Sequence, residues 1–318
     1  MTYKTMAEVW DDPARPWPCI VYVSTTNLCN ANCFCCVNDR VQKPRGIMSL
    51  DDFRKISDKI SRRGLKIGAM FCFGEPLMDP TLTYKYAYAQ SIDVLSYMVG
   101  LNTNCTYLTP DRYEGILQHT PNITLSFWNT GEEYERMTGL NWEDNYRRAI
   151  DFISYRDAHK PDYMIFIGVN RVPGYSLSNV QRAFEGQNVV WVQDVEFRHR
   201  DPVLTGPLNR LLSNPSILCD GHRGVVQVHW NCDCEYCAFD MIGSKEGGDT
   251  KFGNLLTDSW EDLEKNFRRR WKEGSKLCCR CDYWNRASSV IDAGMQLPNP
   301  LPPDWDNWKL PFCQEGHS

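Results

Sequence analysis

Four cysteines lie within eight positions of one segment, STTNLCNANCFCCVND, which covers residues 24–39. They are Cys29, Cys33, Cys35 and Cys36, and they follow an apolar run that is suited to a buried strand. Thiols at this density form disulfides, hold a metal, or are clustered by chance. The compartment of the chain helps to decide between the first two alternatives.

The N-terminal segment MTYKTMAEVWDDPARPWP has no basic stretch followed by an apolar core, so it does not resemble a signal peptide. The chain also has no apolar stretch long enough to span a bilayer. We therefore expect a cytosolic protein. Its net charge of −5 gives no indication of a nucleic acid or a membrane surface as partner.

Metal ligation is then the leading interpretation of the thiols. Structural disulfides are rare in a reducing compartment, and a chain of 318 residues does not need them to be stable. The odd total of 15 cysteines also fits complete pairing poorly.

Strands and helices must position these residues. Helix-period segments alternate with apolar runs between residues 19 and 200, and one of them begins at Ser49 in capping-box style and ends at Gly64. The apolar runs are CIVYVS, KIGAMFCFG, VLSYMVGLN, NITLSFW, YMIFIGVN and VVWVQDVEF. Buried strands that alternate with helices predict a parallel sheet covered by helices. Six such units predict an α/β fold, an open sheet or a partial (β/α)6 barrel.

The alternation stops near DPVLTGPLNRLLSNP, where proline and glycine become frequent. We expect residues 1–205 to form the barrel and residues 206–295 a small second domain. The second region is rich in cysteine and poor in long apolar runs, so a metal could organise it. Residues 296–318, rich in proline and tryptophan, are expected to be a strap packed on the body.

Cys29, Cys33 and Cys36 have the spacing C-x3-C-x2-C in the loop after the first expected strand. Open α/β folds place their sites at this end of the sheet. A structural zinc site needs four ligands, and Cys35 is badly placed to join its neighbour Cys36 in one tetrahedron. Three thiolates on a four-iron cluster would instead leave one iron open to a ligand from outside the protein. A zinc knuckle or a fortuitous run remains the alternative.

With this loop, the chain resembles the radical S-adenosylmethionine (SAM) superfamily. CFGEP ends the second strand like the family's Gly-Gly-Glu-Pro motif, with Phe73 in place of the first glycine. LNTNC ends the third strand like the family's Thr-Asn-Gly, with Cys105 in place of glycine. The resemblance implies SAM contacts at strand ends and beside the cluster: Gly74, Glu75, Pro76, Thr103, Asn104, Ser126, Asn170 and Cys35.

The resemblance also implies the chemistry. A [4Fe-4S] cluster on the three cysteines binds SAM through its amine and carboxylate, and Glu75 would hold the methionyl amine. One electron then cleaves the sulfonium bond and gives a 5′-deoxyadenosyl radical. The protein positions the substrate and keeps water away. An external one-electron donor such as flavodoxin or ferredoxin would be the partner.

A second cysteine group follows the pattern C-x17-C-x40-C-x2-C and consists of Cys219, Cys237, Cys278 and Cys281. The segment FGNLLTDSWEDL between them resembles the Gly-Asn-Leu stretch and Trp-containing helix of SPASM and twitch auxiliary domains. This resemblance implies one fully ligated auxiliary cluster, hence two [4Fe-4S] clusters in all, with a role in electron transfer. A structural zinc site is the alternative.

Two sets of residues are candidates for the chemistry on the substrate. Cys232 and Cys234, in HWNCDCEYC, could give a hydrogen atom to a substrate radical, as in radical SAM epimerases; otherwise they are inert thiols. Glu196 and His199, in DVEFRHRD at the sixth strand end, could deprotonate a carbinol radical; otherwise they belong to a salt-bridged rim.

The expected substrate is a small molecule, like those of the carbohydrate and aminocyclitol enzymes of antibiotic biosynthesis that the chain resembles. The segment before the first expected strand is too short for the recognition domain that many peptide-modifying members carry, and the charged groups of DVEFRHRD suit a hydroxylated or amino-substituted substrate. We expect hydrogen abstraction from a carbinol or ring carbon of a sugar or aminocyclitol, giving epimerisation or two-electron oxidation. The surplus thiols favour epimerisation slightly. A peptide-modifying radical SAM enzyme and a non-catalytic zinc-binding protein are the alternatives.

Overall fold

The structure is a computed structural model of the chain. It describes residues 17–18, 20–33, 36, 44–71, 74–96, 100–171, 178–196, 224–237 and 250–273. For residues 170–171, 192–196 and 271–273 it describes the backbone only.

All six expected strands are present in the expected order. They are β1 (Ile20–Val23), β2 (Ile67–Ala69), β3 (Leu101–Thr103), β4 (Ile123–Ser126), β5 (Ile165–Arg171) and β6 (Val190–Glu196). β1 pairs with β2, and β3 to β6 form a second sheet in that order, with every one of these pairs parallel. The segment before β3 also makes a parallel bridge from Leu95 to Ile67 of β2, which links the two sheets.

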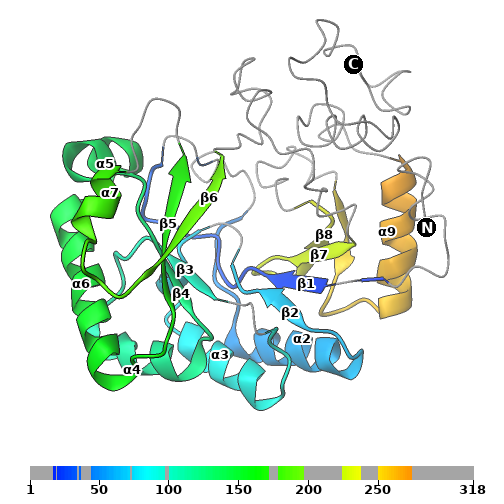
Figure 1. Cartoon of the computed structure of the whole chain (residues 1–318). Coiled ribbons are helices and arrows are strands. Elements are labelled where there is room, and N and C mark those ends of the chain that lie inside the picture. Colours follow the sequence, from blue (N-terminus) through cyan, green and yellow to red (C-terminus); the bar gives the residue numbers. More distant parts are fainter. Residues whose placement is uncertain are drawn as a thin grey trace, which may run out of the picture.

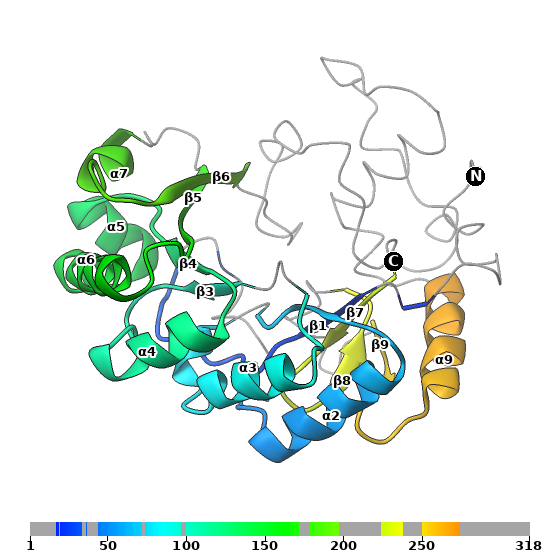
Figure 2. The ribbon, with the colours of Figure 1, turned by 60° about the horizontal axis from the view of Figure 1, so that its bottom comes forward.

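Helices cover the outside of this curved arrangement (Figures 1 and 2). They are α2 (Leu50–Arg62), α3 (Leu82–Ser91), α4 (Pro110–His119), α5 (Gly131–Thr138), α6 (Trp142–His159) and α7 (Ser178–Ala183), with a 3-10 turn η2 (Pro76–Met78) after β2. Parallel strands with helices on their outer face make a partial (β/α)6 barrel, as the sequence predicted.

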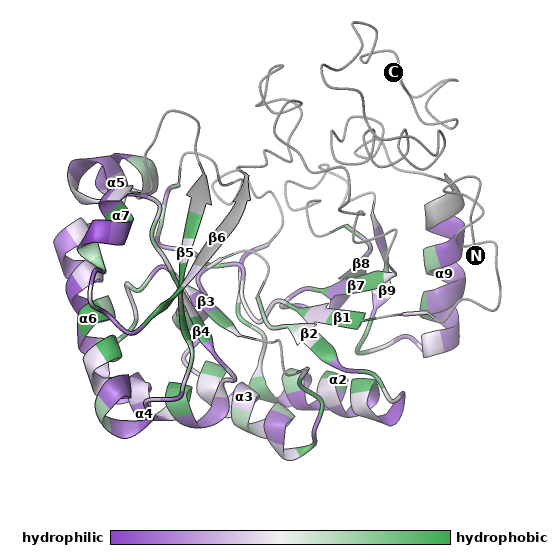
Figure 3. Cartoon of the chain, viewed as in Figure 1, coloured by the Kyte–Doolittle hydropathy of each residue, from purple (hydrophilic) through white to green (hydrophobic). Residues whose placement is uncertain are grey.

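Helix α2 shows how the sequence builds this outer layer. Ser49 caps it by accepting a hydrogen bond from the Asp52 amide, 3.0 Å away. Phe53, Ile56 and Ile60 recur at helical spacing and are fully buried. Burial of each such side chain contributes about 1.5–3 kcal/mol. The charged residues between them remain on the hydrophilic outer side that Figure 3 shows for the helices.

Helix α3 was not foreseen. Its inward positions include Lys85, a charged residue where an apolar one is expected, so the helical period is obscured. The Lys85 ammonium lies 2.5 Å from the Asp79 carboxylate, and both side chains are fully buried. The pair ties α3 to the turn that follows η2.

A C-terminal unit extends the sheet of β1. It consists of β7 (Val225–Val228), β8 (Asp233–Glu235), β9 (Lys251–Asn254) and α9 (Trp260–Glu273). β7 pairs in parallel with β1, and the strand order is β2-β1-β7-β8-β9. Trp17 packs against Phe252 and Phe267, with ring centroids 5.8 and 5.2 Å away. The unit therefore shares its core with the barrel (Figure 1).

The expected boundary at residues 205/206 and the strap at residues 296–318 lie outside the described residues. Within the residues that are described, no helix is both long and apolar enough to cross a membrane.

Candidate functional site

The loop after β1 carries three half-buried thiols, those of Cys29, Cys33 and Cys36. The pKa of Cys29 is raised to about 11 and that of Cys33 to about 12, mainly by burial and in smaller part by the charge of neighbouring thiols. The three sulfurs are thus within electrostatic reach of one another on one loop. Among the described residues, no group of three or more His, Cys, Asp and Glu side chains is arranged to hold a single metal ion.

Gly74 brings the end of β2 against this loop. Its φ of +90° is in the left-handed region, and a Cβ there would lie 2.6 Å from the Leu28 carbonyl oxygen. The next residue, Glu75, donates its backbone N–H to the same oxygen at 2.7 Å. Only glycine permits this approach, which accounts for the glycine in the CFGEP motif.

The Glu75 carboxylate joins the ends of β2 and β3. It accepts hydrogen bonds from the Thr103 hydroxyl at 2.7 Å, the Asn104 amide at 2.7 Å and the Leu77 amide at 3.1 Å. The side chain is buried, and burial raises its pKa to about 7 although these hydrogen bonds lower it. Three donors of the chain thus occupy the carboxylate that we expected to hold the SAM amine, and that contact stays a prediction.

The end of β3 also reaches the thiol loop. Asn104 donates from Nδ2 to Oδ1 of Asn30, at 3.0 Å, and Asn30 lies between the first two cysteines of the loop. Cys105, where the related motif has glycine, has a φ of +70°. The left-handed backbone that favours glycine is therefore kept although the residue differs.

The remaining strand-end residues are described in part. Ser126 ends β4 and accepts a hydrogen bond from Trp128 Nε1 at 3.2 Å. Asn170 and Glu196 lie at the ends of β5 and β6, and only their backbone is described. Cys237, half-buried, follows β8. Several expected site residues lie outside the described residues: Cys35, His199, Cys219, Cys278 and Cys281, together with Phe73 of the motif.

The two candidate hydrogen-atom donors face the helices. Strand register places Cys234 on the same face as Val228 and Val23. Burial, and then the charge of Asp52 in α2, raises the pKa of Cys232 to about 12. Burial lowers the pKa of Lys59 in the same helix, and the nearby Cys234 thiol opposes this shift. Both side chains belong to the hydrophobic core. Both thiols are therefore buried, and their role as hydrogen-atom donors stays a prediction.

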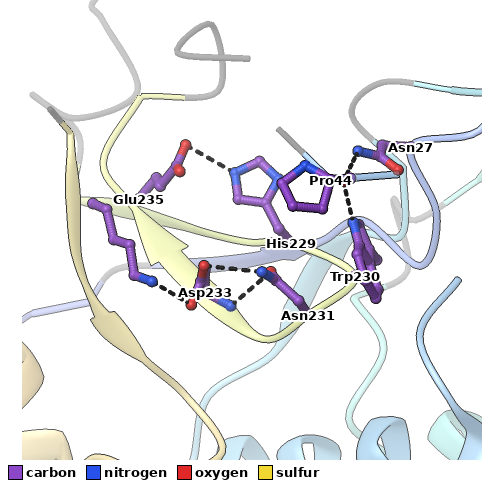
Figure 4. Close-up of a pocket in the computed structure, with 8 residues that line it drawn as sticks. Asn27, Pro44, His229, Trp230, Asn231, Asp233 and Glu235 are labelled. Atoms are coloured by element: carbon purple, nitrogen blue, oxygen red, sulfur yellow. Dashed lines mark hydrogen bonds and ion pairs between the residues drawn. The ribbon is translucent and has the colours of Figure 1, made fainter. Parts of the chain in front are cut away.

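The opposite face of the β7–β8 hairpin lines a small pocket that opens to solvent (Figure 4). His229, Asp233 and Glu235 alternate along this face, and Lys251 joins them from β9. His229 Nε2 lies 2.9 Å from Glu235 Oε2, and the Lys251 ammonium lies 2.8 Å from Asp233.

Both ends of the thiol loop complete the pocket. Asn27 donates from Nδ2 to the Pro44 carbonyl at 2.9 Å, and Trp230 of the hairpin donates from Nε1 to the same oxygen at 3.0 Å. The polar residues of this pocket were not predicted from the sequence. In HWNCDCEYC, polar residues occupy every second position, and this period of two could have indicated a polar strand face.

Comparison with known proteins identifies the sequence pattern. A family model described as "Radical SAM superfamily" matches residues 23–184, which hold the thiol loop, the β2 and β3 motifs and the ends of β4 and β5. No relative was found among curated protein sequences.

Solved structures of low sequence identity share the fold. They include anSMEcpe with bound AdoMet (TM-score 0.56, 14% identity, 85% of this chain and 87% of that chain). SuiB from Streptococcus suis, bound to S-adenosylmethionine, gives a TM-score of 0.54 at 13% identity and covers 94% of this chain and 78% of its own. BtrN in complex with AdoMet and 2-DOIA gives 0.50 at 13% identity and covers 87% of this chain and 92% of its own.

Proposed function

Because the chain belongs to the radical SAM superfamily, we propose that it is an enzyme that abstracts a hydrogen atom from a carbinol or ring carbon of a sugar or aminocyclitol. Cys29, Cys33 and Cys36 would hold the [4Fe-4S] cluster that the family uses with SAM. When bound, this pair of cofactors supplies the one-electron chemistry that removes the hydrogen atom.

One observation carries the proposal: the loop that holds three neighbouring cysteines is fixed in place by the ends of β2 and β3. Gly74 and Glu75 contact the thiol loop through Leu28, and Asn104 contacts it through Asn30. Soft thiolate donors are the ligands of iron–sulfur clusters. In the type and number of donors, the three cysteines therefore fit the cluster.

We further propose a second, auxiliary cluster of twitch type on Cys219, Cys237, Cys278 and Cys281, within a domain of residues 206–295. The end of β9 and helix α9 support it, because the resemblance to SPASM and twitch domains implied a Gly-Asn-Leu stretch followed by a Trp-containing helix. Cys237, which follows β8, would supply one thiol of the set. An external donor such as flavodoxin or ferredoxin would supply electrons.

For the outcome on the substrate, the structure changes our preference. Epimerisation needs a hydrogen-atom donor, and Cys232 and Cys234 are buried against α2 rather than exposed in the pocket. Oxidation to a ketone needs only an acceptor for a proton and one for an electron. We therefore propose two-electron oxidation over inversion.

A peptide-modifying activity is the second candidate. It is favoured by the shared fold of anSMEcpe, whose structure with AdoMet and the Cp18Cys peptide has a TM-score of 0.55 to this chain at 14% identity. The small polar pocket beside the thiol loop favours the sugar or aminocyclitol instead.

The test is anaerobic reconstitution followed by reaction with SAM and dithionite. Two four-iron clusters predict about eight irons per chain. A panel of aminocyclitols, amino sugars and short peptides is then screened for 5′-deoxyadenosine formation above the level without substrate. Stimulation by peptides alone would replace the first candidate by the second. A colourless protein that binds zinc and no iron would refute both.

A further inference from the structure

The pocket beside the thiol loop contains a carboxylate–imidazole pair that none of the motifs includes. His229 and Glu235 are 5% and 2% exposed, so both are more than nine-tenths buried, and both line the pocket. His229 Nε2 lies 2.9 Å from Glu235 Oε2 (Figure 4). An ionised carboxylate only accepts, so in the neutral imidazole Nε2 carries the hydrogen and the free lone pair lies on Nδ1.

Nδ1 is the reactive atom of this arrangement. Among the described residues, the hydrogen bond of this ring is the one between Nε2 and Glu235. A carboxylate that fixes the tautomer of a histidine also stabilises the imidazolium that forms when the other nitrogen takes a proton. His229 is therefore arranged as a base whose proton-accepting atom is available to a ligand.

Its surroundings fit a ligand that donates hydrogen bonds. The side chains of Asn231, Asp233 and Glu235 line the pocket together with His229. Their oxygens accept hydrogen bonds, and the hydroxyl and amino groups of a ring donate them.

The location relates this pair to the proposed chemistry. β7 runs parallel to β1, and Val228 pairs with Val23, so His229 follows β7 at the same edge at which the thiol loop follows β1. Asn27 and Pro44, the two ends of that loop, line the pocket with His229. A ring bound here would lie beside the loop that carries the proposed cluster.

We propose that His229, oriented by Glu235, binds a hydroxyl group of a sugar or aminocyclitol ring and takes its proton during oxidation. This inference rests on the proposed function. After hydrogen abstraction the carbon bears a radical and a hydroxyl. The O–H bond breaks and an N–H bond forms at Nδ1. An auxiliary cluster held by Cys219, Cys237, Cys278 and Cys281 would accept the remaining electron, which leaves a ketone. His229 takes the role that we expected of Glu196 or His199.

The first experiment reads the tautomer of the full-length holoenzyme labelled with 15N-histidine. Ring-nitrogen NMR correlations, assigned with His229→Gln, should show a protonated Nε2 and an unprotonated Nδ1. Glu235→Gln keeps an acceptor oxygen and should keep this tautomer, whereas Glu235→Leu should lose it. A wild-type His229 with its proton on Nδ1 would overturn the proposal.

The second experiment uses scyllo-inosamine, an aminocyclitol, as the probe. Its addition should shift the His229 Nδ1 resonance saturably, and His229→Gln should weaken binding at least tenfold. His119→Gln is the matched control and should bind as the wild type does, since His119 is half-buried on the helix layer, where it bonds to Gln90. A His229 resonance that stays unmoved at the solubility limit of the inosamine, or that moves only with a short cysteine-containing peptide, would refute the assignment.

These outcomes are separate from those that test the proposed function. SAM cleavage by dithionite-reduced protein depends on the thiol loop and not on His229. If cleavage persists while the inosamine fails to bind, the pocket assignment falls and the radical SAM function stands.

Discussion

Glu75 is a buried carboxylate that the chain needs for its own structure. It accepts from residues of the β2 and β3 ends and supports the turn that faces the thiol loop. Its place in a recognisable motif could be predicted from the sequence. Its partners could not, because Leu77, Thr103 and Asn104 meet it only through the tertiary fold.

Glu75→Gln should destabilise the chain in a pH-dependent way. The pKa is about 7 in the folded chain against 4.5 for the free group, so the folded state holds a proton that the unfolded state releases between these values. Wild-type stability from this group therefore falls as pH rises from 4.5 to 7, by about 3 kcal/mol in total, and is flat above. In the variant, the NH2 group of Gln replaces one carboxylate oxygen, so the Leu77 or the Asn104 amide loses its acceptor, which costs about 1–3 kcal/mol.

The difference in thermal midpoint between the wild type and this variant should thus be largest near pH 5 and smaller at pH 8. Thr103→Val is the control, because it removes one hydrogen bond and no titrating group. A difference that is the same at both pH values would show that Glu75 titrates normally.

Cys232 and Cys234 are two further buried residues for which the structure makes a prediction. Their side chains lie in the core on the α2 side of the hairpin. We expect that the variant Cys232→Ala/Cys234→Ala still forms product once a substrate is identified, and that the wild-type product gains no deuterium in D2O. Loss of product with continued 5′-deoxyadenosine formation, or deuterium at an inverted carbon, would restore the role of a hydrogen-atom donor.

At the scale of the elements, the β7–β8 hairpin closes the thiol loop. The Trp230 ring covers Gly46, where a Cβ would lie 2.6 Å from the ring, and its Nε1 donates to the Pro44 carbonyl. The Asn27 side chain accepts from the Gly46 amide at 2.9 Å. A loop proposed to hold iron is therefore anchored by an element almost 200 residues later in the chain.

Trp230→Ala should loosen the proposed cluster without touching a ligand. The lost hydrogen bond and ring packing amount to about 2 kcal/mol. We expect faster bleaching of the iron–sulfur absorbance in air and faster iron loss to a chelator. Trp230→Phe keeps a ring over Gly46 but loses the hydrogen bond, so its rates of bleaching and iron loss should lie between those of the wild type and of Trp230→Ala. Identical bleaching rates for all three proteins would show that the hairpin does not anchor the loop.

The ion pair between Asp79 and Lys85 fixes the turn that joins Glu75 and η2 to α3. Lys85→Met leaves a buried carboxylate without its cation and should destabilise the fold by about 3–5 kcal/mol. Adding Asp79→Asn should recover part of this loss, because the amide oxygen can still accept from Thr81. Denaturant unfolding measures both. If Lys85→Met is as stable as the wild type, the ion pair between Asp79 and Lys85 does not form in solution.

The strands and most helices could be predicted because their apolar periods are regular, as in α2 and in β4. Helix α3 could not, since a charged pair replaces an apolar contact inside it. The pairing of β7 with β1 could not be predicted either, because nothing in the sequence of Val225–Val228 specifies which edge of the barrel it joins. The polar pocket depends on that pairing and was missed with it.

At the scale of the whole molecule, the C-terminal unit and the barrel share one sheet and one hydrophobic core. The sheet runs from β2 through β1 to β9, and the Trp260 indole of α9 donates to the Lys59 carbonyl of α2 at 3.3 Å. The thiol loop lies between the two halves, held by Glu75 and Asn104 on one side and by Trp230 on the other. This arrangement would place a substrate pocket and the proposed cluster at the same edge.

The most direct test of this account is reductive cleavage of SAM. Anaerobically reconstituted wild-type protein, reduced with dithionite, should convert SAM to 5′-deoxyadenosine and methionine, measured by chromatography. The variant Cys29→Ala/Cys33→Ala/Cys36→Ala should lose about half of its iron and form no 5′-deoxyadenosine. Equal 5′-deoxyadenosine formation by the two proteins, or full iron content in the variant, would contradict the assignment of these three cysteines and the function built on them.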